Sequence, residues 1–371
     1  MSEATLTNVD AVVHPVDLGI SDELNSVVRA IVRNKHILDA AVSDQGAAML
    51  ARDLHDGDYG PHEPMPFLHK ILPFPHAIER SPDYRPATVP TANAIGCSWN
   101  WRKKHLDENQ AATRREKLSN TVALLDGSLD TTAYCWIKPL GLIVPSEGKN
   151  RVDFFREEGI DSIPADINEC TYPTPDRIAI YNVEHNGFKA TWAVLDGRWV
   201  ENVPNPSWTL PLMTAYGART ARAWPSDFPK AELVVRALFE PSGTTTPLGH
   251  PDFGDAVVVD LETIRARAAY QSEVMPCAGL QLNHTKIDPR LWLISGALSL
   301  VSLLAMGLSP DSWTDFQIAA GILFGASFSA GFFPTLAPIF RTQRRNLDHQ
   351  LQLPLELAPK NDSSPRPRYL G

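Results

Sequence analysis

Residues suited to binding a phosphate group are concentrated in one segment, residues 141–167, which reads GLIVPSEGKNRVDFFREEGIDSIPADI. A glycine-led polar turn precedes a predicted helix over 149–158, and the first turn of a helix offers unpaired N–H groups and a positive dipole end to an anion. Lys149 and Arg151 place cations there, which disfavours an isolated helix, so a bound anion would relieve the conflict. We therefore predict a phosphate-binding turn made of Gly148, Lys149, Asn150 and Arg151.

Glu147, immediately before this turn, is the candidate catalytic residue. A carboxylate next to a bound phosphate could position a metal ion or a water molecule for hydrolysis. The alternative is an ordinary acidic residue of a solvated turn. The alternative for the whole segment is a surface helix with two solvated basic side chains.

The elements that must position this turn follow from the residues around it. Residues 142–144 predict a buried strand before the turn, and residues 160–167 predict a second strand after the helix. Gly159 is suited to end the helix, because glycine readily adopts the left-handed conformation found at helix C-termini. On the helix we expect Val152, Phe154 and Phe155 to pack inward and Arg156, Glu157 and Glu158 to face water.

The order of these residues also carries a family resemblance. Gly148, Arg151, an apolar helix face, Gly159 and then Ile163-Pro164-Ala165 resemble the second conserved box of the ParB/sulfiredoxin-like superfamily, over about residues 140–167. In that family a glycine-led turn with an arginine grips nucleotide phosphates. The resemblance thus implies a ParB/sulfiredoxin-like module over 110–203, with a nucleoside triphosphate and Mg²⁺ as the ligand.

The chain departs from the family pattern at three points. Sulfiredoxins carry a catalytic cysteine within this turn, whereas Lys149 and Asn150 stand in that place here, so redox repair chemistry is not expected. ParB partition proteins usually show two adjacent arginines, where this chain has Asn150 followed by Arg151. No helix-turn-helix is recognisable after the box.

Two apolar segments near the C-terminus predict a membrane hairpin. Residues 291–308 contain no charged residue over 18 positions, and residues 316–340 contain none over 25. At about 1.5 Å per residue both can cross a hydrocarbon core of about 30 Å, the first only just. The seven residues between them are enough only for a turn. The alternative is a pair of buried core helices.

Charged residues around the hairpin predict its orientation. Lys286 and Arg290 precede it, Arg341, Arg344 and Arg345 follow it, and the turn carries Asp311 and Asp315. The positive-inside rule then places the N-terminal body and the C-terminal tail in the cytoplasm, which suits a bacterial inner membrane. Within the second segment Gly321, Gly325 and Ser329 form a small-residue face that predicts helix contact, within the hairpin or in a homo-oligomer.

The net charge of the body, residues 1–285, limits its partners. The chain has 34 Lys+Arg and 43 Asp+Glu, of which residues 286–371 hold eight and six, so the body carries 26 basic and 37 acidic residues. This net charge of −11 opposes non-specific attraction to nucleic acid. Direct DNA binding is therefore not favoured.

Cysteine and histidine spacing predicts neither a metal site nor a disulfide framework. The four cysteines are widely scattered, without a CxxC motif, so we expect a reduced, cytosolic body. Four histidines recur every seven residues, but prolines between them prevent a shared helix face. The residues concerned are Cys97, Cys135, Cys170, Cys277, His55, His62, His69 and His76.

Along the chain we expect a helical and proline-rich region over 1–109, the ParB/sulfiredoxin-like module over 110–203, an α/β extension over 204–285, the hairpin over 286–345 and a disordered tail over 346–371. Helices are predicted from residue 22, over 47–54, 108–125 and 261–270. Residues 55–90 are proline-rich and read as an extended, largely irregular segment, and residues 204–211 are a second proline-rich stretch. Strands are predicted over 133–138, 140–144, 176–184, 189–195, 198–203, 231–239 and 256–261.

Taken together, these features predict an α+β protein with a C-terminal two-helix membrane anchor. The predicted function is that of a membrane-anchored, cytosolic ParB-like protein that binds a nucleotide or phosphate ligand, as an NTP hydrolase or a switch. Two alternatives stay open. One is a nucleic-acid-linked factor of a plasmid, mobile element or phage-defence system, and the other is an oligomerising membrane effector.

Overall fold

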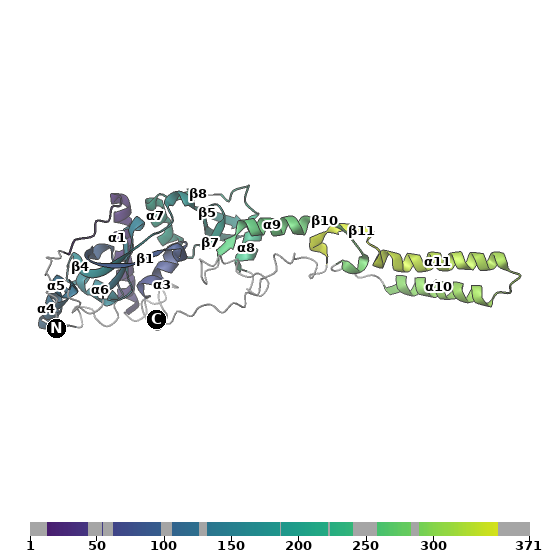
Figure 1. The fold of residues 1–371 in the computed structure, drawn as a ribbon, viewed down its shortest axis with the longest axis horizontal. Coiled ribbons are helices and arrows are strands. Elements are labelled where there is room, and N and C mark those ends of the chain that lie inside the picture. The colour runs from purple at the N-terminus through teal and green to yellow at the C-terminus, as the bar shows by residue number, and fades with distance from the viewer. Residues whose placement is uncertain are drawn as a thin grey trace, which may run out of the picture. The chain divides into compact units, whose positions relative to one another are not determined.

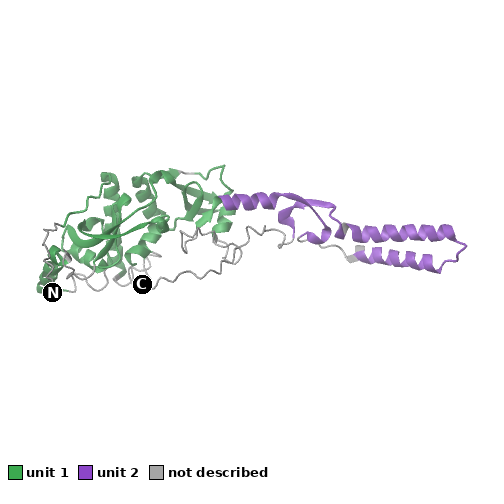
Figure 2. Ribbon diagram, viewed as in Figure 1, with its two compact units in different colours: residues 1–261 green, residues 262–371 purple. Residues whose placement is uncertain are grey.

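The chain forms two compact units, residues 1–261 and 262–371 (Figure 2). The structure is a computed structural model, and it describes residues 13–43, 54, 62–97, 106–125, 132–185, 187–221, 223–239, 258–282 and 289–347. Both helices and sheets are present, so the predicted α+β class is confirmed. Most of the predicted helix over 47–54 and most of the predicted disordered tail lie outside the described residues.

The first sheet of residues 1–261 contains the predicted phosphate turn. Its strand order is β1-β4-β2-β3, where β4 runs parallel to β2 and antiparallel to β1, and β3 runs antiparallel to β2. The chain passes from β2 to β4 through β3 and helix α6. The elements are β1 (Arg80–Pro90), β2 (Ala133–Ile137), β3 (Leu142–Pro145), α6 (Lys149–Glu157) and β4 (Ser162–Cys170). The predicted order of strand, turn, helix and strand is thus present.

Each face of this sheet is covered by helices, because successive strand residues point to opposite sides. On one side Tyr134, Ile143 and Ile167 pack against α6 and α4 (Glu108–Leu118), near α5 (Thr121–Leu125). On the other side Ile137, Leu142 and Val144 pack against α1 (Asp22–Ser43), α3 (Pro64–Ile71) and α7 (Pro206–Tyr216). Both sides of the sheet are therefore buried.

A second sheet, of order β8-β5-β6-β7-β9, shares the second of these cores. Strands β5, β6 and β7 form the predicted antiparallel meander. Asp196 and Gly197 join β6 to β7 with φ of 56° and 66°, as a tight hairpin requires. The strands are β5 (Ile178–His185), β6 (Phe188–Leu195), β7 (Trp199–Asn202), β8 (Arg219–Ala221) and β9 (Val258–Asp260).

The structure corrects two secondary-structure predictions for this unit. Residues 231–239 form helix α8 (Ala231–Phe239) instead of a strand, because Val234 and Leu238 share one buried helix face and a short apolar run fits either element. Residues 55–90, predicted to be extended and largely irregular, include helix α3 and the extended strand β1, and the proline-rich stretch 204–211 runs into α7. Prolines start both helices, where an N–H is not needed, and β1 is an edge strand of its sheet, which tolerates proline.

A disulfide joins Cys135 on β2 to Cys170 at the end of β4, with Cα atoms 6.2 Å apart. The prediction of four reduced cysteines is therefore wrong for this pair. In the parallel register Cys170 lies opposite Ile137. Ile137 is two residues after Cys135, so Cys135 and Cys170 lie on the same face of the sheet. This proximity arises from the pairing of strands 35 residues apart, which cysteine spacing alone does not reveal. Cys97 and Cys277 are buried and are not part of a disulfide in the described residues.

Residues 262–371 contain the two predicted apolar helices, α10 (Pro289–Leu308) and α11 (Thr314–Leu336), which lie side by side (Figure 1). The stretch Thr314–Phe333 is long and apolar enough to cross a membrane, and Trp292–Leu308 is a shorter apolar helix. Strands β10 (Val274–Cys277) and β11 (Phe340–Gln343) pair antiparallel on either side of the two helices in sequence. Helix α9 (Leu261–Ser272) precedes β10.

Candidate functional site

A glycine lies at each end of α6, and each one sets where the helix begins or ends. Gly148 is the N-cap, with φ of 78°, and no side chain caps the first turn. A Cβ at Gly148 would lie 3.1 Å from Cγ2 of Thr132, so the turn also needs the small residue for space. At the other end Gly159 donates to the carbonyl of Arg156 (3.1 Å) and Ile160 donates to that of Phe155 (2.9 Å). This Schellman arrangement confirms the predicted helix stop.

The predicted binding residues form one contiguous turn at the start of α6. Nζ of Lys149 pairs with the carboxylate of Glu63, and the guanidinium of Arg151 donates to the hydroxyl of Thr132. Asn150 is half-buried. Glu147, the candidate catalytic residue, is exposed, and its backbone N–H donates to the carbonyl of Ala133 (3.1 Å). The cations are thus held at the helix start by Glu63 and Thr132, which the sequence did not indicate.

The inward face of α6 is as predicted, but its outward face is not. Val152, Phe154 and Phe155 are buried. Arg156, predicted to face water, donates to Oδ1 of Asp153 (2.6 Å) and to the carbonyls of Thr91 (3.1 Å) and Ala94 (2.7 Å). The side chain of Glu158 is 1% exposed and pairs with Arg115. These predictions are wrong because the segment around Thr91–Asn93 and helix α4 cover this face of α6.

A buried charge cluster lies behind the turn. Asp153 of α6 is fully buried, and its carboxylate lies 3.2 Å from Nδ1 of His36 in addition to its contact with Arg156. Burial alone raises the pKa of Asp153, but the hydrogen bond from His36 and the charge of Arg156 lower it below its usual value. A Cβ at Gly96 would collide with this carboxylate. The cluster fixes α6 against α1.

A second buried ion pair joins α1 to the segment that carries Glu63. Lys35 and Asp39, one turn apart on α1, are both about 1% exposed and pair with each other. Nζ of Lys35 also donates to the carbonyl of His62 (2.9 Å). This bond fixes the backbone next to Glu63, and Glu63 in turn reaches Lys149. This ion pair could have been predicted from the sequence, because two oppositely charged residues stand four positions apart on the apolar face of the predicted helix.

Cys97 lies beside the start of α6, where its N–H donates to the carbonyl of Lys149 (3.3 Å). Burial raises the pKa of its thiol to about 11, so at neutral pH it is a protonated thiol and a poor nucleophile. Among the described residues no group of three or more His, Cys, Asp or Glu could hold a metal ion.

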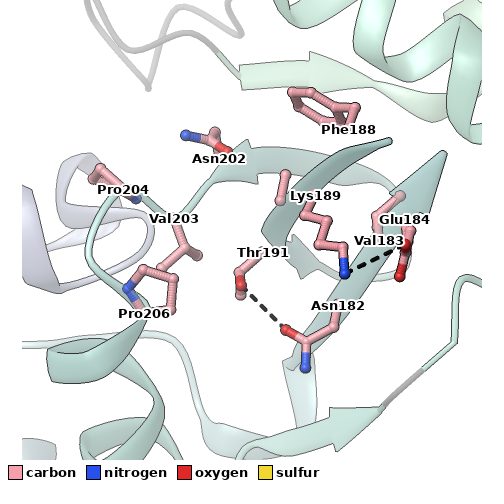
Figure 3. A pocket seen from close by; sticks show the side chains of 11 residues that line it. Asn182, Val183, Glu184, Phe188, Lys189, Thr191, Asn202, Val203, Pro204 and Pro206 are labelled. Carbon is pink, nitrogen blue, oxygen red and sulfur yellow. Dashed lines mark hydrogen bonds and ion pairs between the residues drawn. The ribbon is translucent and has the colours of Figure 1, made fainter. Parts of the chain in front are cut away.

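Two hollows of the surface lie away from the predicted turn. One, of about 660 Å³, lies over the β5–β6 hairpin, where Thr191 donates to Asn182 (3.1 Å) and Lys189 pairs with Glu184 (3.4 Å) beside Phe188 (Figure 3). The other, of about 670 Å³, lies between α1 and the C-terminal end of α6. Neither is lined by residues 147–151.

Comparison of the chain with protein-family models, with curated proteins and with solved structures gave no match.

Proposed function

We propose that the protein is a membrane-anchored nucleotide-binding protein whose α6 turn holds the phosphates of a nucleoside triphosphate with Mg²⁺. One observation carries the proposal: the N-terminus of α6 lacks a side-chain cap, starts at a glycine with φ of 78° and has Lys149 and Arg151 in its first turn. A helix start that lacks a cap and carries cations suits an anion. The resemblance of residues 140–167 to the second box of ParB-like proteins supports a nucleotide as the molecule that supplies this anion.

In this proposal each residue of the turn has a distinct role. The backbone N–H groups at the start of α6 and the side chains of Lys149 and Arg151 hold the phosphate oxygens, and Gly148 admits them close to the backbone. Asn150 adds an amide donor at the same turn. Glu147 holds Mg²⁺ through water or orients the water that attacks the terminal phosphate. Such a site serves as a hydrolase or as a switch.

The proposal is tested by thermal-shift titration of the full-length protein in detergent with ATP, CTP, GTP and ADP, each with Mg²⁺. We expect one nucleotide to raise the melting temperature of the wild type and to leave Arg151→Ala unshifted. The control is Arg177→Ala, which removes a surface ion pair with Asp196 on the second sheet. Equal nucleotide binding by a folded Arg151→Ala variant would refute the phosphate site.

We further propose that α10 and α11 cross the membrane as a hairpin. Large apolar side chains are exposed along both helices, among them Leu293, Val301, Ile322 and Phe333, each at least 58% exposed. Water would disfavour this surface, whereas lipid would cover it. Inside the hairpin Ser299 and Ser327 hydrogen-bond (2.9 Å), which satisfies polar groups within the bilayer. Resistance of the protein to alkaline extraction from membranes tests this anchor.

A second candidate function, an oligomerising membrane effector, is favoured by the outer face of α11. Gly321 faces α10, since its Cβ position lies 3.6 Å from Sδ of Met306. Gly325 and Ser329 are instead exposed, and no atom lies within 4 Å of the Cβ position of Gly325. They leave room for a helix of a second copy. If so, Gly325→Leu converts a cross-linked oligomer in detergent to a monomer, and an unchanged cross-linking pattern would exclude this face.

A further inference from the structure

The strands β10 and β11 form a short ribbon next to the apolar helices. In their register Pro276 lies opposite Arg341 and Val274 lies opposite Gln343. Because paired residues of antiparallel strands point to the same side, Val274, Pro276 and Arg341 share one face. All three are exposed, Val274 by 59%. One face of the ribbon thus combines apolar side chains with a cation.

The depth of this ribbon relative to a bilayer follows from α11. The stretch Thr314–Phe333 has 20 residues, about the length that crosses a hydrocarbon core of about 30 Å. Near its end Trp292 packs edge-on against Phe332, with ring centroids 4.8 Å apart, and tryptophan is enriched at membrane interfaces. The ribbon begins seven residues after Phe333, at Phe340. If Thr314–Phe333 crosses the bilayer as proposed above, the ribbon lies at the level of the lipid headgroups.

Apolar surface and positive charge both continue from the helices into the ribbon. Leu336, Ile339 and Phe340 are exposed by 64%, 50% and 41%. Arg290 and Arg341 are also exposed at this end of the helices. At the other end, Asp311 lies in the turn between the helices and Asp315 lies in the first turn of α11. An apolar surface bordered by arginines matches the acyl chains and phosphates of an anionic lipid.

Arg344 fixes the end of the ribbon that presents this surface. Its guanidinium donates to Oε2 of Glu273 (2.8 Å) and to the hydroxyl of Tyr270 (2.5 Å), and lies 3.8 Å from the centroid of the Tyr270 ring. The N–H of Arg344 also donates to the carbonyl of Glu273 (2.9 Å). These bonds attach the end of β11 to the end of α9. Arg341 is therefore presented from a fixed backbone.

We propose that this basal surface, made of Val274, Pro276, Arg290, Ile339 and Arg341, binds the headgroups of anionic phospholipids. Arg341 contacts the lipid phosphate, and the apolar members lie against the upper acyl chains. The proposal rests on insertion of the hairpin in the membrane. It adds a preference for lipid charge, which insertion alone does not require.

The test measures lipid binding to the full-length protein in a non-ionic detergent by native mass spectrometry. Phosphatidylglycerol and phosphatidylcholine with the same acyl chains are added separately. We expect tighter binding of phosphatidylglycerol, weakened about fivefold in Arg341→Gln, because one basic residue near an anionic lipid contributes about 1 kcal/mol. The matched control is Lys189→Gln, which removes an exposed cation of the second sheet and should change nothing.

These measurements distinguish a failure of the lipid-binding proposal from a failure of the proposed membrane insertion. Equal binding of the two lipids, or an unchanged preference in Arg341→Gln, overturns the basal surface, even when alkaline extraction leaves the protein in the membrane. Release of the protein by alkali overturns insertion, and with it the basal surface. Retention in the membrane together with a preference that Arg341→Gln weakens supports both.

Discussion

Glu63 places a carboxylate of the chain itself at the turn proposed to bind phosphate. It pairs with Lys149, and its neighbour His62 is fixed through its carbonyl by the buried Lys35. A phosphate that binds at the start of α6 must therefore compete with Glu63 for Lys149. The competing pair is partly exposed, with Lys149 28% and Glu63 59% exposed, so it is weak enough to be displaced.

We predict that Glu63→Gln raises the affinity for the nucleotide about threefold to fivefold, because removal of a surface ion pair frees about 1 kcal/mol or less. Isothermal titration of the full-length protein measures the change. In a Lys149→Gln background the same substitution should have no effect. Glu184→Gln, which removes a comparable exposed pair with Lys189, is the control. An equal gain with and without Lys149 would show that Glu63 acts elsewhere.

Glu201 on β7 makes the stability of the body depend on pH. Its carboxylate accepts the N–H of Phe74 (2.7 Å), yet burial raises the pKa of the carboxyl to about 7. In the unfolded chain the pKa of a glutamate side chain is about 4.3. Because the folded-state pKa is the higher one, the protonated carboxyl favours the folded state below about pH 4, and this contribution is lost as the pH rises through 7.

We therefore expect the wild type to lose stability between pH 5 and pH 8, and Glu201→Gln to lose less over the same range. Denaturant unfolding of the full-length protein in detergent at several pH values gives the comparison. The exposed Glu184→Gln variant should follow the wild type. Parallel pH curves for the wild type and Glu201→Gln would contradict the assignment.

At the scale of elements, the Cys135–Cys170 disulfide closes a loop that contains β3, α6 and nearly all of β4. A cross-link limits the freedom of the unfolded chain, and for a loop of 35 residues this amounts to about 4 kcal/mol. We predict that reduction lowers the free energy of unfolding of the body by about this amount. Denaturant titration with and without dithiothreitol measures it.

The doubly substituted Cys135→Ser, Cys170→Ser protein is the control for reduction, since its unfolding should not respond to dithiothreitol. Mass spectrometry of a non-reduced digest should contain a peptide pair joined through these two cysteines. Alkylation of both residues in the unfolded, never-reduced protein would show that the bond is absent.

Elements defined by local signals could be predicted from the sequence, and those defined by tertiary pairing could not. Gly148, Gly159 and the Asp196-Gly197 turn fixed the limits of α6 and of the β6–β7 hairpin, because each acts through its own backbone. The contiguous residues 147–151 could be proposed as a site for the same reason. Glu63, Thr132 and the buried partners of Asp153 come from distant segments, so no spacing along the chain indicated them.

At the scale of the whole molecule, two features favour different cellular compartments for the body. Basic residues such as Arg290 and Arg341 flank the apolar helices and favour a cytoplasmic body. The Cys135–Cys170 disulfide favours an oxidising compartment. We predict that the charge rule holds, since it acts during insertion, and that the disulfide withstands the cytoplasm because it is buried.

Protease treatment of intact spheroplasts and of inverted vesicles tests this orientation. The body should be digested only in inverted vesicles, and a periplasmic protein of the same cells serves as the control. Digestion of the body in intact spheroplasts would place it outside and would favour oxidation of Cys135 and Cys170 by the compartment.

The ribbon of β10 and β11 also bears on how the protein is made. β10 leaves the ribosome more than 60 residues before β11, and both apolar helices lie between them in the chain. The ribbon can therefore close only after synthesis has passed the end of α11. A nascent chain arrested before Phe340 has an unpaired β10, whereas one released after Gln343 can complete the pairing. Closure of the ribbon thus marks the end of the biogenesis of the hairpin.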